Sequence, residues 1–147
     1  MSVVLKAKKE IEVRFSEVDS LAIVWHGHHI KYFEDGREAF GKKYGLGYMD
    51  VYREGYFTPI TSVHCDYRGI IEYETNLIIE TEYVPVQAAK LIFKYTLLDG
   101  ATGKKLATGT SEQVFLDKNK ELQLINPPFF EEWKIRNGIV KEQMLVK

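Results

Sequence analysis

The sequence has few of the features that mark secreted, membrane or nucleic-acid-binding proteins. Cys65 is the single cysteine among 147 residues, which excludes an internal disulfide framework. The net charge is −1, from 20 basic and 21 acidic residues, so no bulk charge draws the chain towards DNA, RNA or an anionic membrane. No apolar run approaches the length of a membrane span, and the run from Val3 to Leu5 is too short for a signal-peptide core. We therefore expect a cytoplasmic protein with no membrane span and no nucleic-acid partner.

The chain contains enough apolar material for a folded core. Apolar residues make up 45% and aromatic residues 13% of the sequence, well outside the range of disordered chains. Its length suits one domain, which we expect to cover residues 1–147. Cys65 lies among alternating residues, so we interpret it as a small buried side chain of a strand.

The periodicity of the sequence predicts one long helix among several strands. Alternation through Ile11, Val13 and Phe15 is typical of a half-buried strand. Large side chains then recur every three or four residues from Ile30 to Tyr44, which predicts a helix that ends at the following glycine. Period-two patterns predict further strands at 58–69, 75–84, 89–99 and 105–117, and shorter helices are expected at 48–55 and 127–138.

The order of these elements indicates an α+β fold with an antiparallel sheet. Long strands of this kind can curve around a single helix and leave it nearly enclosed. Gly36 and Gly41 lie inside the predicted helix, where each glycine costs roughly 1 kcal/mol. We therefore expect this helix to pack closely against a flat surface, where larger side chains would not fit.

Three histidines precede the helix and raise the question of a metal site. His26, His28 and His29 fall at positions i, i+2 and i+3, and position i+2 points away from the other two on a helix. No HExxH spacing occurs, whereas a catalytic zinc needs three converging ligands. The local pattern disfavours a metal, and a partly exposed polar first turn is the simpler interpretation of His28 and His29.

Acid/base chemistry fits Asp19 better. This residue lies a few positions before the helix, whose first turn carries unpaired N–H groups and partial positive charge. The backbone N–H groups of His26 and Gly27 are placed to hold a developing oxyanion, while the Asp19 carboxylate attacks or activates water. A thiolate, unlike an alkoxide, leaves without a proton donor because a thiol pKa is near ~8.5, so such a site suits thioesters. The alternative is that Asp19 only caps a turn or the helix.

The stretch VRFSEVDSLAIVWHGHHIKYFEDGREAF (13–40) resembles the opening motif of the 4-hydroxybenzoyl-CoA thioesterase family, whose fold is the hot-dog fold. It is similar in particular to the acyl-CoA thioesterase branch that includes the Tol-Pal-associated enzymes. The shared pattern is an Arg-aromatic pair, Glu-x-Asp, an apolar pair, aromatic-His and Tyr-Phe-Glu-x-x-Arg, found here at Arg14-Phe15, Glu17 and Asp19, Ile23-Val24, Trp25-His26, and Tyr32-Phe33-Glu34 with Arg37. Ala22 and His29 depart from the family, which usually has glycine and tyrosine there.

The resemblance implies a hot-dog fold, with a long central helix wrapped by a curved antiparallel sheet of about five strands. It implies an acyl-CoA thioesterase that needs no metal or organic cofactor. Asp19 would be the catalytic carboxylate, the N–H of residue 26 would polarise the thioester carbonyl, and the His26 side chain would assist catalysis or positioning. It also implies a homo-oligomer, a dimer or tetramer, in which Asp19 lies near the partner's strand around 58–67.

Other residues are candidates for substrate contacts. Basic side chains that could bind the CoA phosphates are Arg68, Lys90, Lys104 and Lys105, and those that could line an acyl pocket are Trp25, His29, Tyr32, Phe33 and Phe57. Surface solvation and core packing are the competing explanations. We interpret Glu34 and Arg37 as an ion pair on the helix surface. Two other functions stay open: a hot-dog protein that binds acyl-CoA or acyl-carrier protein without hydrolysis, and an enoyl-CoA hydratase or dehydratase.

Overall fold

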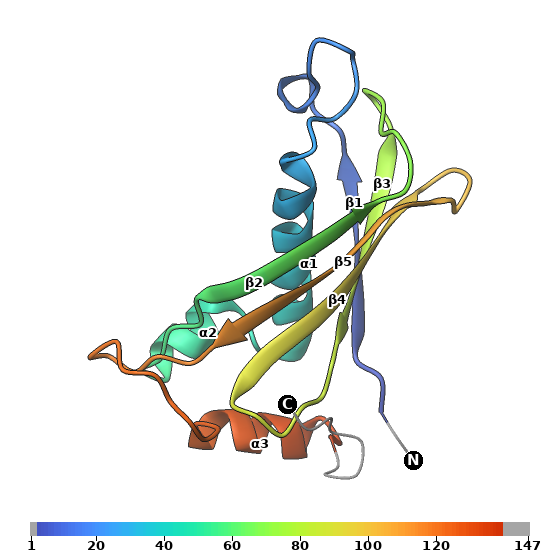
Figure 1. Cartoon of the computed structure of the whole chain (residues 1–147). Helices are drawn as coiled ribbons and strands as arrows, with labels where there is room; N and C mark the ends of the chain where they lie inside the picture. Colours follow the sequence, from blue (N-terminus) through green and yellow to red (C-terminus); the bar gives the residue numbers. More distant parts are fainter. Residues whose placement is uncertain (1–2, 140–147) are drawn as a thin grey trace.

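The computed structural model describes residues 3–139, in which one five-stranded antiparallel sheet carries a long helix on one face (Figure 1). The strand order is β1-β3-β4-β5-β2, so β1 and β2 form the two edges. The elements are β1 (Lys6–Glu12), the 3₁₀ turn η1 (Phe15–Glu17), α1 (His28–Tyr44), α2 (Tyr48–Arg53), β2 (Ile60–Tyr67), β3 (Asn76–Tyr83), β4 (Lys90–Asp99), β5 (Lys105–Val114) and α3 (Pro128–Arg136). The α+β class, the antiparallel sheet and the long helix agree with the sequence-based predictions.

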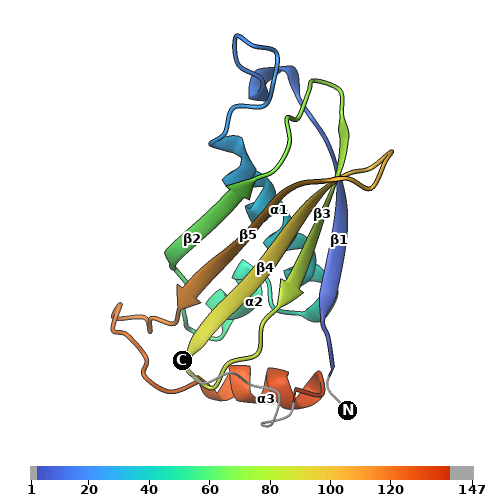
Figure 2. The same ribbon diagram turned by 45° about the vertical axis from the view of Figure 1, so that its right-hand side comes forward.

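The core lies between α1 and the concave face of the sheet. Alternate residues of the central strands point towards the helix, and Phe33 of α1 stacks on Tyr95 of β4 with ring centroids 4.5 Å apart. The short helix α3 closes the end of the core near the C-terminal end of α1, where Trp133 donates a hydrogen bond of 2.8 Å to the carbonyl of Tyr44 (Figure 2). Most of the buried apolar residues form one connected cluster.

The two helix glycines allow close packing, as predicted, although only one of them faces the sheet. A Cβ atom on Gly36 would lie 2.7 Å from Ile79 Cγ1 and closer still to Thr81 Oγ1, both on β3. A Cβ atom on Gly41 would instead meet the Gly47 backbone, 2.8 Å from its nitrogen. Other positions of α1, such as Lys31, Glu34 and Glu38, are exposed, so the described chain does not enclose the helix.

The prediction that the first strand continues to Phe15 is wrong. β1 ends at Glu12, and η1 begins at Phe15, which is 74% exposed. The Glu17 side chain accepts hydrogen bonds from the Arg14 backbone N–H at 2.8 Å and from the Tyr32 hydroxyl at 3.0 Å. These bonds stabilise a tight turn where alternation alone predicted extended chain.

The edge strand β2 pairs only with β5 among the residues that the structure describes. All its residues are exposed except Cys65, which is half-buried. Its apolar members include Ile60, Val63 and Tyr67. A long, exposed strand edge of this kind is a surface that proteins usually cover or pair.

Candidate active site

A tight loop between η1 and α1 carries Asp19. Val18 and Val24 form an antiparallel bridge, and the Asp19 N–H donates to the Ile23 carbonyl at 2.8 Å. At the tip, the Ala22 N–H donates to the Asp19 carbonyl at 2.9 Å, with Ala22 in the left-handed region at φ 63°. At position 22 the family usually has glycine and this chain has alanine. The backbone conformation at this position favours glycine.

The Asp19 carboxylate caps this turn through one of its two oxygens. Its Oδ1 accepts a 2.8 Å hydrogen bond from the Leu21 N–H, so the capping role considered above is present. Within residues 3–139, no hydrogen bond or ion pair involves Oδ2, and Asp19 is half-buried. Since a carboxylate has two oxygens, capping by one leaves the other available to a substrate or water.

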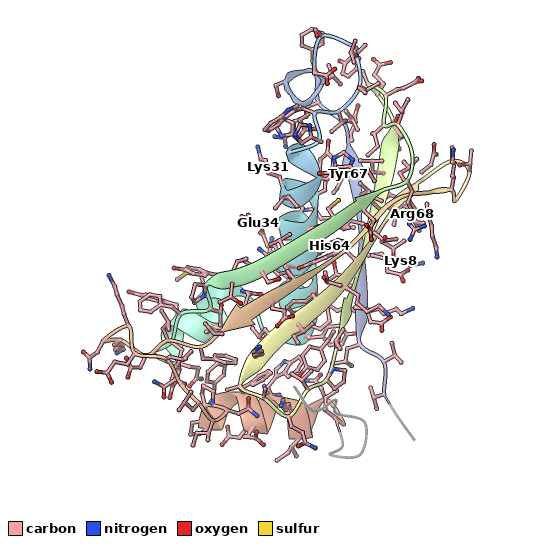
Figure 3. The ribbon with its side chains drawn as sticks, viewed as in Figure 1. Lys8, Lys31, Glu34, His64, Tyr67 and Arg68 are labelled. Atoms are coloured by element: carbon pink, nitrogen blue, oxygen red, sulfur yellow. The ribbon has the colours of Figure 1, made fainter. Side chains whose placement is uncertain are left out.

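The loop is fastened to the end of β2 and the segment that follows it. The Val24 N–H donates to the Ile71 carbonyl at 2.8 Å, and Ile23 forms a bridge with Glu72. The Tyr67 hydroxyl donates to the His26 carbonyl at 2.7 Å. Figure 3 shows Tyr67 at the end of β2 near the start of α1. These contacts fix the loop before the helix relative to the sheet.

The start of α1 offers two backbone donors. The His28 N–H donates to the Trp25 carbonyl, but in the described chain neither the His26 nor the Gly27 N–H reaches a protein acceptor. The Trp25 ring packs against Gly27 so closely that a Cβ there would lie 2.7 Å from Trp25 Cε3. Free donors at a helix start, shielded on one side by an indole, suit a developing negative charge.

The three histidines have different environments. The His26 side chain is exposed, with its ring centroid 4.9 Å from that of Trp25. His29 is 4% exposed and its ring centroid lies 4.6 Å from that of Tyr67, so the prediction of a partly exposed first turn is wrong for this residue. Burial lowers the pKa of His29 below its ordinary value. No three His, Cys, Asp or Glu side chains of residues 3–139 are grouped as metal ligands would be.

The residues predicted to line an acyl pocket lie in different environments. Tyr32 and Phe33 are core residues, and burial together with the Glu17 carboxylate raises the pKa of the Tyr32 hydroxyl. His29 is also buried, whereas Trp25 is 49% exposed at the loop. Phe57 is half-buried, with its ring centroid 5.8 Å from that of Tyr52 near the other end of β2.

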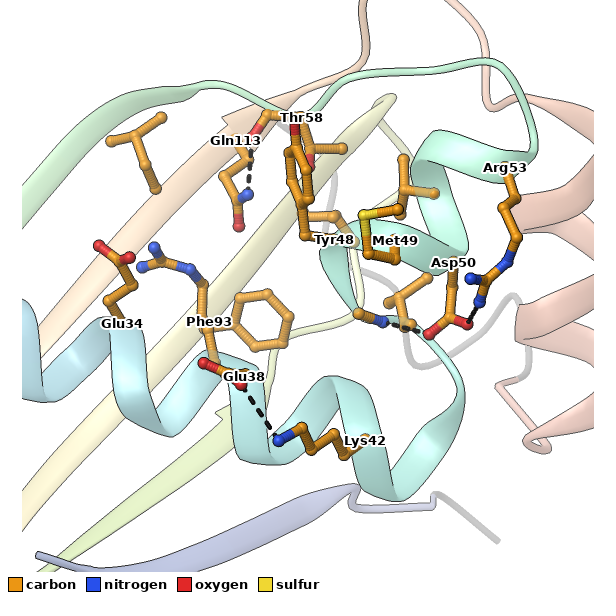
Figure 4. Close-up of a pocket in the computed structure, with 16 residues that line it drawn as sticks. Glu34, Glu38, Lys42, Tyr48, Met49, Asp50, Arg53, Thr58, Phe93 and Gln113 are labelled. Atoms are coloured by element: carbon orange, nitrogen blue, oxygen red, sulfur yellow. Dashed lines mark hydrogen bonds and ion pairs between the residues drawn. The ribbon is translucent and has the colours of Figure 1, made fainter.

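The structure reveals instead a cavity of about 560 Å³ between α1, α2 and the sheet (Figure 4). Its lining combines apolar and polar side chains from α1, α2 and three strands: Glu34, Arg37, Glu38, Lys42, Leu46, Tyr48, Met49, Asp50, Val51, Arg53, Thr58, Ile60, Leu91, Phe93 and Gln113, with the backbone of Gly47. Sequence reasoning missed this cavity, although two of its lining residues, Glu34 and Arg37, belong to the motif.

The predicted ion pair between Glu34 and Arg37 is wrong. Arg37 Nη1 donates at 3.1 Å to the Tyr95 hydroxyl, which is also hydrogen-bonded to Ser111. In the described residues, Glu34 forms no ion pair. Arg37 is thus turned towards the sheet rather than towards its neighbour on the helix surface.

The four basic residues predicted to bind the CoA phosphates lie at two different places on the sheet. Arg68 Nε donates to Thr108 Oγ1 at 3.3 Å, and Lys104 Nζ would lie 3.8 Å from a Cβ on Gly69, so both residues lie near the C-terminal end of β2. Lys105 follows at the start of β5. Lys90 lies at the opposite end of the β4–β5 pair and forms an ion pair with Glu112 at 3.3 Å. The loop with Asp19 is on the Arg68 side.

Comparisons with known proteins place this geometry in a family. The model of the thioesterase-like superfamily matches residues 13–134. The chain is 28% identical over 127 residues to YneP of Bacillus subtilis, a protein named provisionally as an acyl-CoA thioesterase. The match covers 86% of this chain and 91% of the relative.

Solved structures share the fold at lower identity. DHNA-CoA thioesterase from Staphylococcus aureus has a TM-score of 0.80 and 21% identity, covering 96% of this chain and 97% of that one. A 4-hydroxybenzoyl-CoA thioesterase variant in complex with 4-hydroxybenzoyl-CoA has a TM-score of 0.75 and 18% identity, covering 88% and 98% of the two chains. The hot-dog fold predicted from the sequence is confirmed. The chain belongs to the thioesterase-like superfamily and is an enzyme of the acyl-CoA thioesterase type.

Proposed function

We propose that the enzyme hydrolyses an acyl-CoA thioester to a free carboxylic acid and CoA at the loop that carries Asp19. The observation that carries this proposal combines one carboxylate oxygen of Asp19 and two backbone N–H groups at the start of α1, none of which has a partner among residues 3–139. These are the two parts that acyl transfer to water requires: a base or nucleophile and a donor for the oxyanion.

With Asp19 as the base, the carboxylate takes one proton from water while the water oxygen bonds to the thioester carbon. The carbonyl electron pair moves to its oxygen, which accepts hydrogen bonds from the His26 and Gly27 N–H groups. The oxyanion then collapses, the carbon–sulfur bond breaks, and CoA leaves as a thiolate. With Asp19 as the nucleophile, its carboxylate oxygen bonds to the thioester carbon and the carbon–sulfur bond breaks, so the thiolate leaves and an acyl-aspartyl anhydride remains. Water then hydrolyses the anhydride to the free acid and the Asp19 carboxylate. The His26 side chain is exposed beside this position, where it assists catalysis or positions the substrate.

The CoA part of the substrate has a candidate binding surface at the same end of the molecule. Arg68, Lys104 and Lys105 are exposed there. Guanidinium and ammonium groups are the usual partners of phosphate. We assign binding of the CoA phosphates to these three side chains. Lys90 is paired with Glu112 at the other end of the sheet, so it would contact CoA only at a site to which another chain contributes.

The active form is proposed to be a dimer joined through β2, or a tetramer of such dimers. Exposed apolar residues gather at both ends of this strand: Leu21, Trp25, Tyr67 and Ile70 at one end, and Tyr52, Ile60, Leu122, Leu124 and Ile125 at the other. In an antiparallel, two-fold pairing of two β2 strands, the first group of each chain faces the second group of its partner. Asp19 would then lie near the start of the partner's β2.

The narrower family assignment is also a proposal. The motif at 13–40 favours the 4-hydroxybenzoyl-CoA branch and its Tol-Pal-associated members, and one neighbour of known structure acts on 4-hydroxybenzoyl-CoA. In the described residues no helix is both long and apolar enough to span a membrane. A cytoplasmic location is proposed on the basis of the sequence composition.

Release of CoA thiol from a panel of acyl-CoAs tests the proposed function. We expect turnover of at least one aromatic or aliphatic acyl-CoA in the presence of a chelator. An absorbance change with enoyl-CoA in the absence of thiol release would indicate a hydratase. Binding of acyl-CoA or acyl-carrier protein with no turnover of any member would indicate a non-hydrolytic protein.

A further inference from the structure

The two backbone donors at the start of α1 belong to two successive peptide units. The His26 N–H shares a peptide unit with the Trp25 carbonyl, and the Gly27 N–H shares one with the His26 carbonyl. A peptide unit is planar and trans, so its C=O and N–H bonds point in opposite directions. A group that binds one of these carbonyls therefore also fixes the direction in which the N–H of the same unit points.

Both carbonyls accept a hydrogen bond, but from different kinds of donor. The Trp25 carbonyl accepts at 2.9 Å from the backbone N–H of His28. The His26 carbonyl accepts at 2.7 Å from the hydroxyl of Tyr67, which lies 41 positions later in the chain. Gly27 is the N-cap residue, so the His26 carbonyl precedes the first carbonyl of the helical ladder. One donor peptide is thus held by the local turn, and the other by a side chain of the sheet.

The sheet holds Tyr67 firmly in place. Tyr67 ends β2 opposite Ala107 of β5, and the two residues that follow it donate their N–H groups to the Leu106 carbonyl at 2.9 and 3.1 Å. Its ring packs edge-to-face against the buried ring of His29, with centroids 4.6 Å apart, and lies 6.4 Å from that of His26. Figure 3 shows this side chain between the end of β2 and the start of α1. The position of the hydroxyl is therefore determined by the strand rather than by the loop.

The Tyr67 hydroxyl also acts on the charge distribution of the peptide. Partial burial raises the pKa of Tyr67, so the hydroxyl keeps its proton at neutral pH and remains a donor. Hydrogen bonds in a chain polarise one another, with a strengthening of about 10–30% per bond. When a thioester oxygen gains negative charge beside the Gly27 N–H, electron density in the peptide shifts towards the His26 oxygen, where the hydroxyl stabilises it. Tyr67 therefore makes the Gly27 N–H a stronger donor with a fixed direction.

We propose that Tyr67 is a positioning residue for thioester hydrolysis, whose hydroxyl orients and polarises the peptide unit between His26 and Gly27 so that the Gly27 N–H holds the oxyanion. This proposal rests on the proposed function, but it depends on no particular oligomer. The alternative is that Tyr67 only fastens the loop to the sheet, as the bond from the Val24 N–H to the Ile71 carbonyl does. The two roles give different results when the hydroxyl alone is removed.

Tyr67→Phe removes the hydroxyl and keeps the ring that contacts His29. Removing an oxyanion donor itself costs about 10² to 10³ in kcat. Tyr67 acts through one further bond, so we expect a smaller loss, of about 3- to 20-fold in kcat, with KM changed by less than about twofold. The matched control is Tyr73→Phe, which removes an exposed hydroxyl from the segment after β2 and should keep the wild-type kcat and KM. An unchanged kcat for Tyr67→Phe, with or without a higher KM, would overturn the proposal.

The vibration of the bound thioester carbonyl gives a direct measure of the oxyanion donors. The probe is whichever of acetyl-, octanoyl-, benzoyl- and 4-hydroxybenzoyl-CoA the wild type hydrolyses fastest, labelled with carbon-13 at the thioester carbonyl. It is bound to Asp19→Asn, which should turn it over slowly, and isotope-edited infrared spectra are recorded. Stronger hydrogen bonds to a carbonyl lower its stretching frequency, so addition of Tyr67→Phe should raise the frequency while addition of Tyr73→Phe should not.

The same spectra separate polarisation from fastening. We expect the double variant Asp19→Asn with Tyr67→Phe to keep the melting temperature of Asp19→Asn and its affinity for the labelled acyl-CoA, and to show only the higher carbonyl frequency. The same frequency with and without the hydroxyl would show that Tyr67 does not act on the oxyanion donors. Absence of thiol release from every acyl-CoA by the wild type would instead be a failure of the proposed function.

Discussion

Ala22 holds the tip of the catalytic loop in a conformation that is unfavourable for its side chain. Its φ of 63° places an L-residue in the left-handed region, at a cost of roughly 1–2 kcal/mol. The Leu21 and Ala22 N–H groups both bond to Asp19, to its side chain and its carbonyl respectively, so the turn retains its shape despite that cost. The strain is thus local to the residue that positions the proposed catalytic carboxylate.

Ala22→Gly should stabilise the protein by about 0.5–1 kcal/mol, because relief of the left-handed strain exceeds the added entropy of the unfolded chain. Urea denaturation measures this. The control is Ala39→Gly within α1, where the same substitution should destabilise by roughly 0.5–1 kcal/mol. A lower free energy of unfolding for Ala22→Gly than for the wild type would show that the turn is not strained.

His29 links stability to pH through its burial. Its folded pKa is lowered, so the unfolded chain takes up the proton first as the pH falls below about 6.5. The free energy of unfolding therefore decreases as the pH falls, because of this residue. The stabilisation that His29 contributes is fully present only above that pH. His29→Phe should reduce the slope of the free energy of unfolding against pH between pH 7 and 5, by less than about 1.36 kcal/mol per pH unit. Parallel curves for wild type and variant, from denaturation at several pH values, would contradict this.

At the scale of elements, Gly36 sets the distance between α1 and β3. Gly36→Ala would add helix propensity but would force a methyl group against Ile79 and Thr81, so we expect a net destabilisation of about 1–3 kcal/mol. Thermal unfolding of this variant beside Lys31→Ala, on the exposed side of the helix, checks it. Lys31→Ala should change stability by less than about 0.5 kcal/mol. Equal behaviour of the two variants would mean that the helix can move away from the sheet at little cost.

The elements that the sequence predicted correctly are those whose signal is local. Periodicity and glycine stops determined α1 and the later strands, and the spacing from Asp19 to the helix indicated the loop. The end of β1 was predicted wrongly because the Glu17 side chain, which bonds to Arg14 and Tyr32, overrides alternation there. The cavity was missed because its lining joins residues from α1 to Gln113, whose proximity depends on strand order.

For the whole molecule, the exposed edge of β2 predicts assembly. Light scattering at micromolar concentration should give at least twice the chain mass of 17.0 kDa. Val63→Lys places a charge on the unpaired edge, so we expect it to yield monomers and to lose thioesterase activity with them. Thr110→Lys, on the exposed face of the inner strand β5, is the matched control and should remain oligomeric. A wild-type monomer with full activity would refute the shared site.

The most direct test of the whole account is kcat/KM of Asp19→Asn on the best acyl-CoA substrate found for the wild type. Asparagine keeps an oxygen that can accept from the Leu21 N–H, so the fold, melting temperature and oligomeric state should be retained. The account predicts a loss of ~10² to 10⁴ in rate, because the base or nucleophile is removed, and a smaller loss for His26→Ala. Wild-type turnover by folded Asp19→Asn would show that this carboxylate only caps its turn, and would contradict the proposed mechanism.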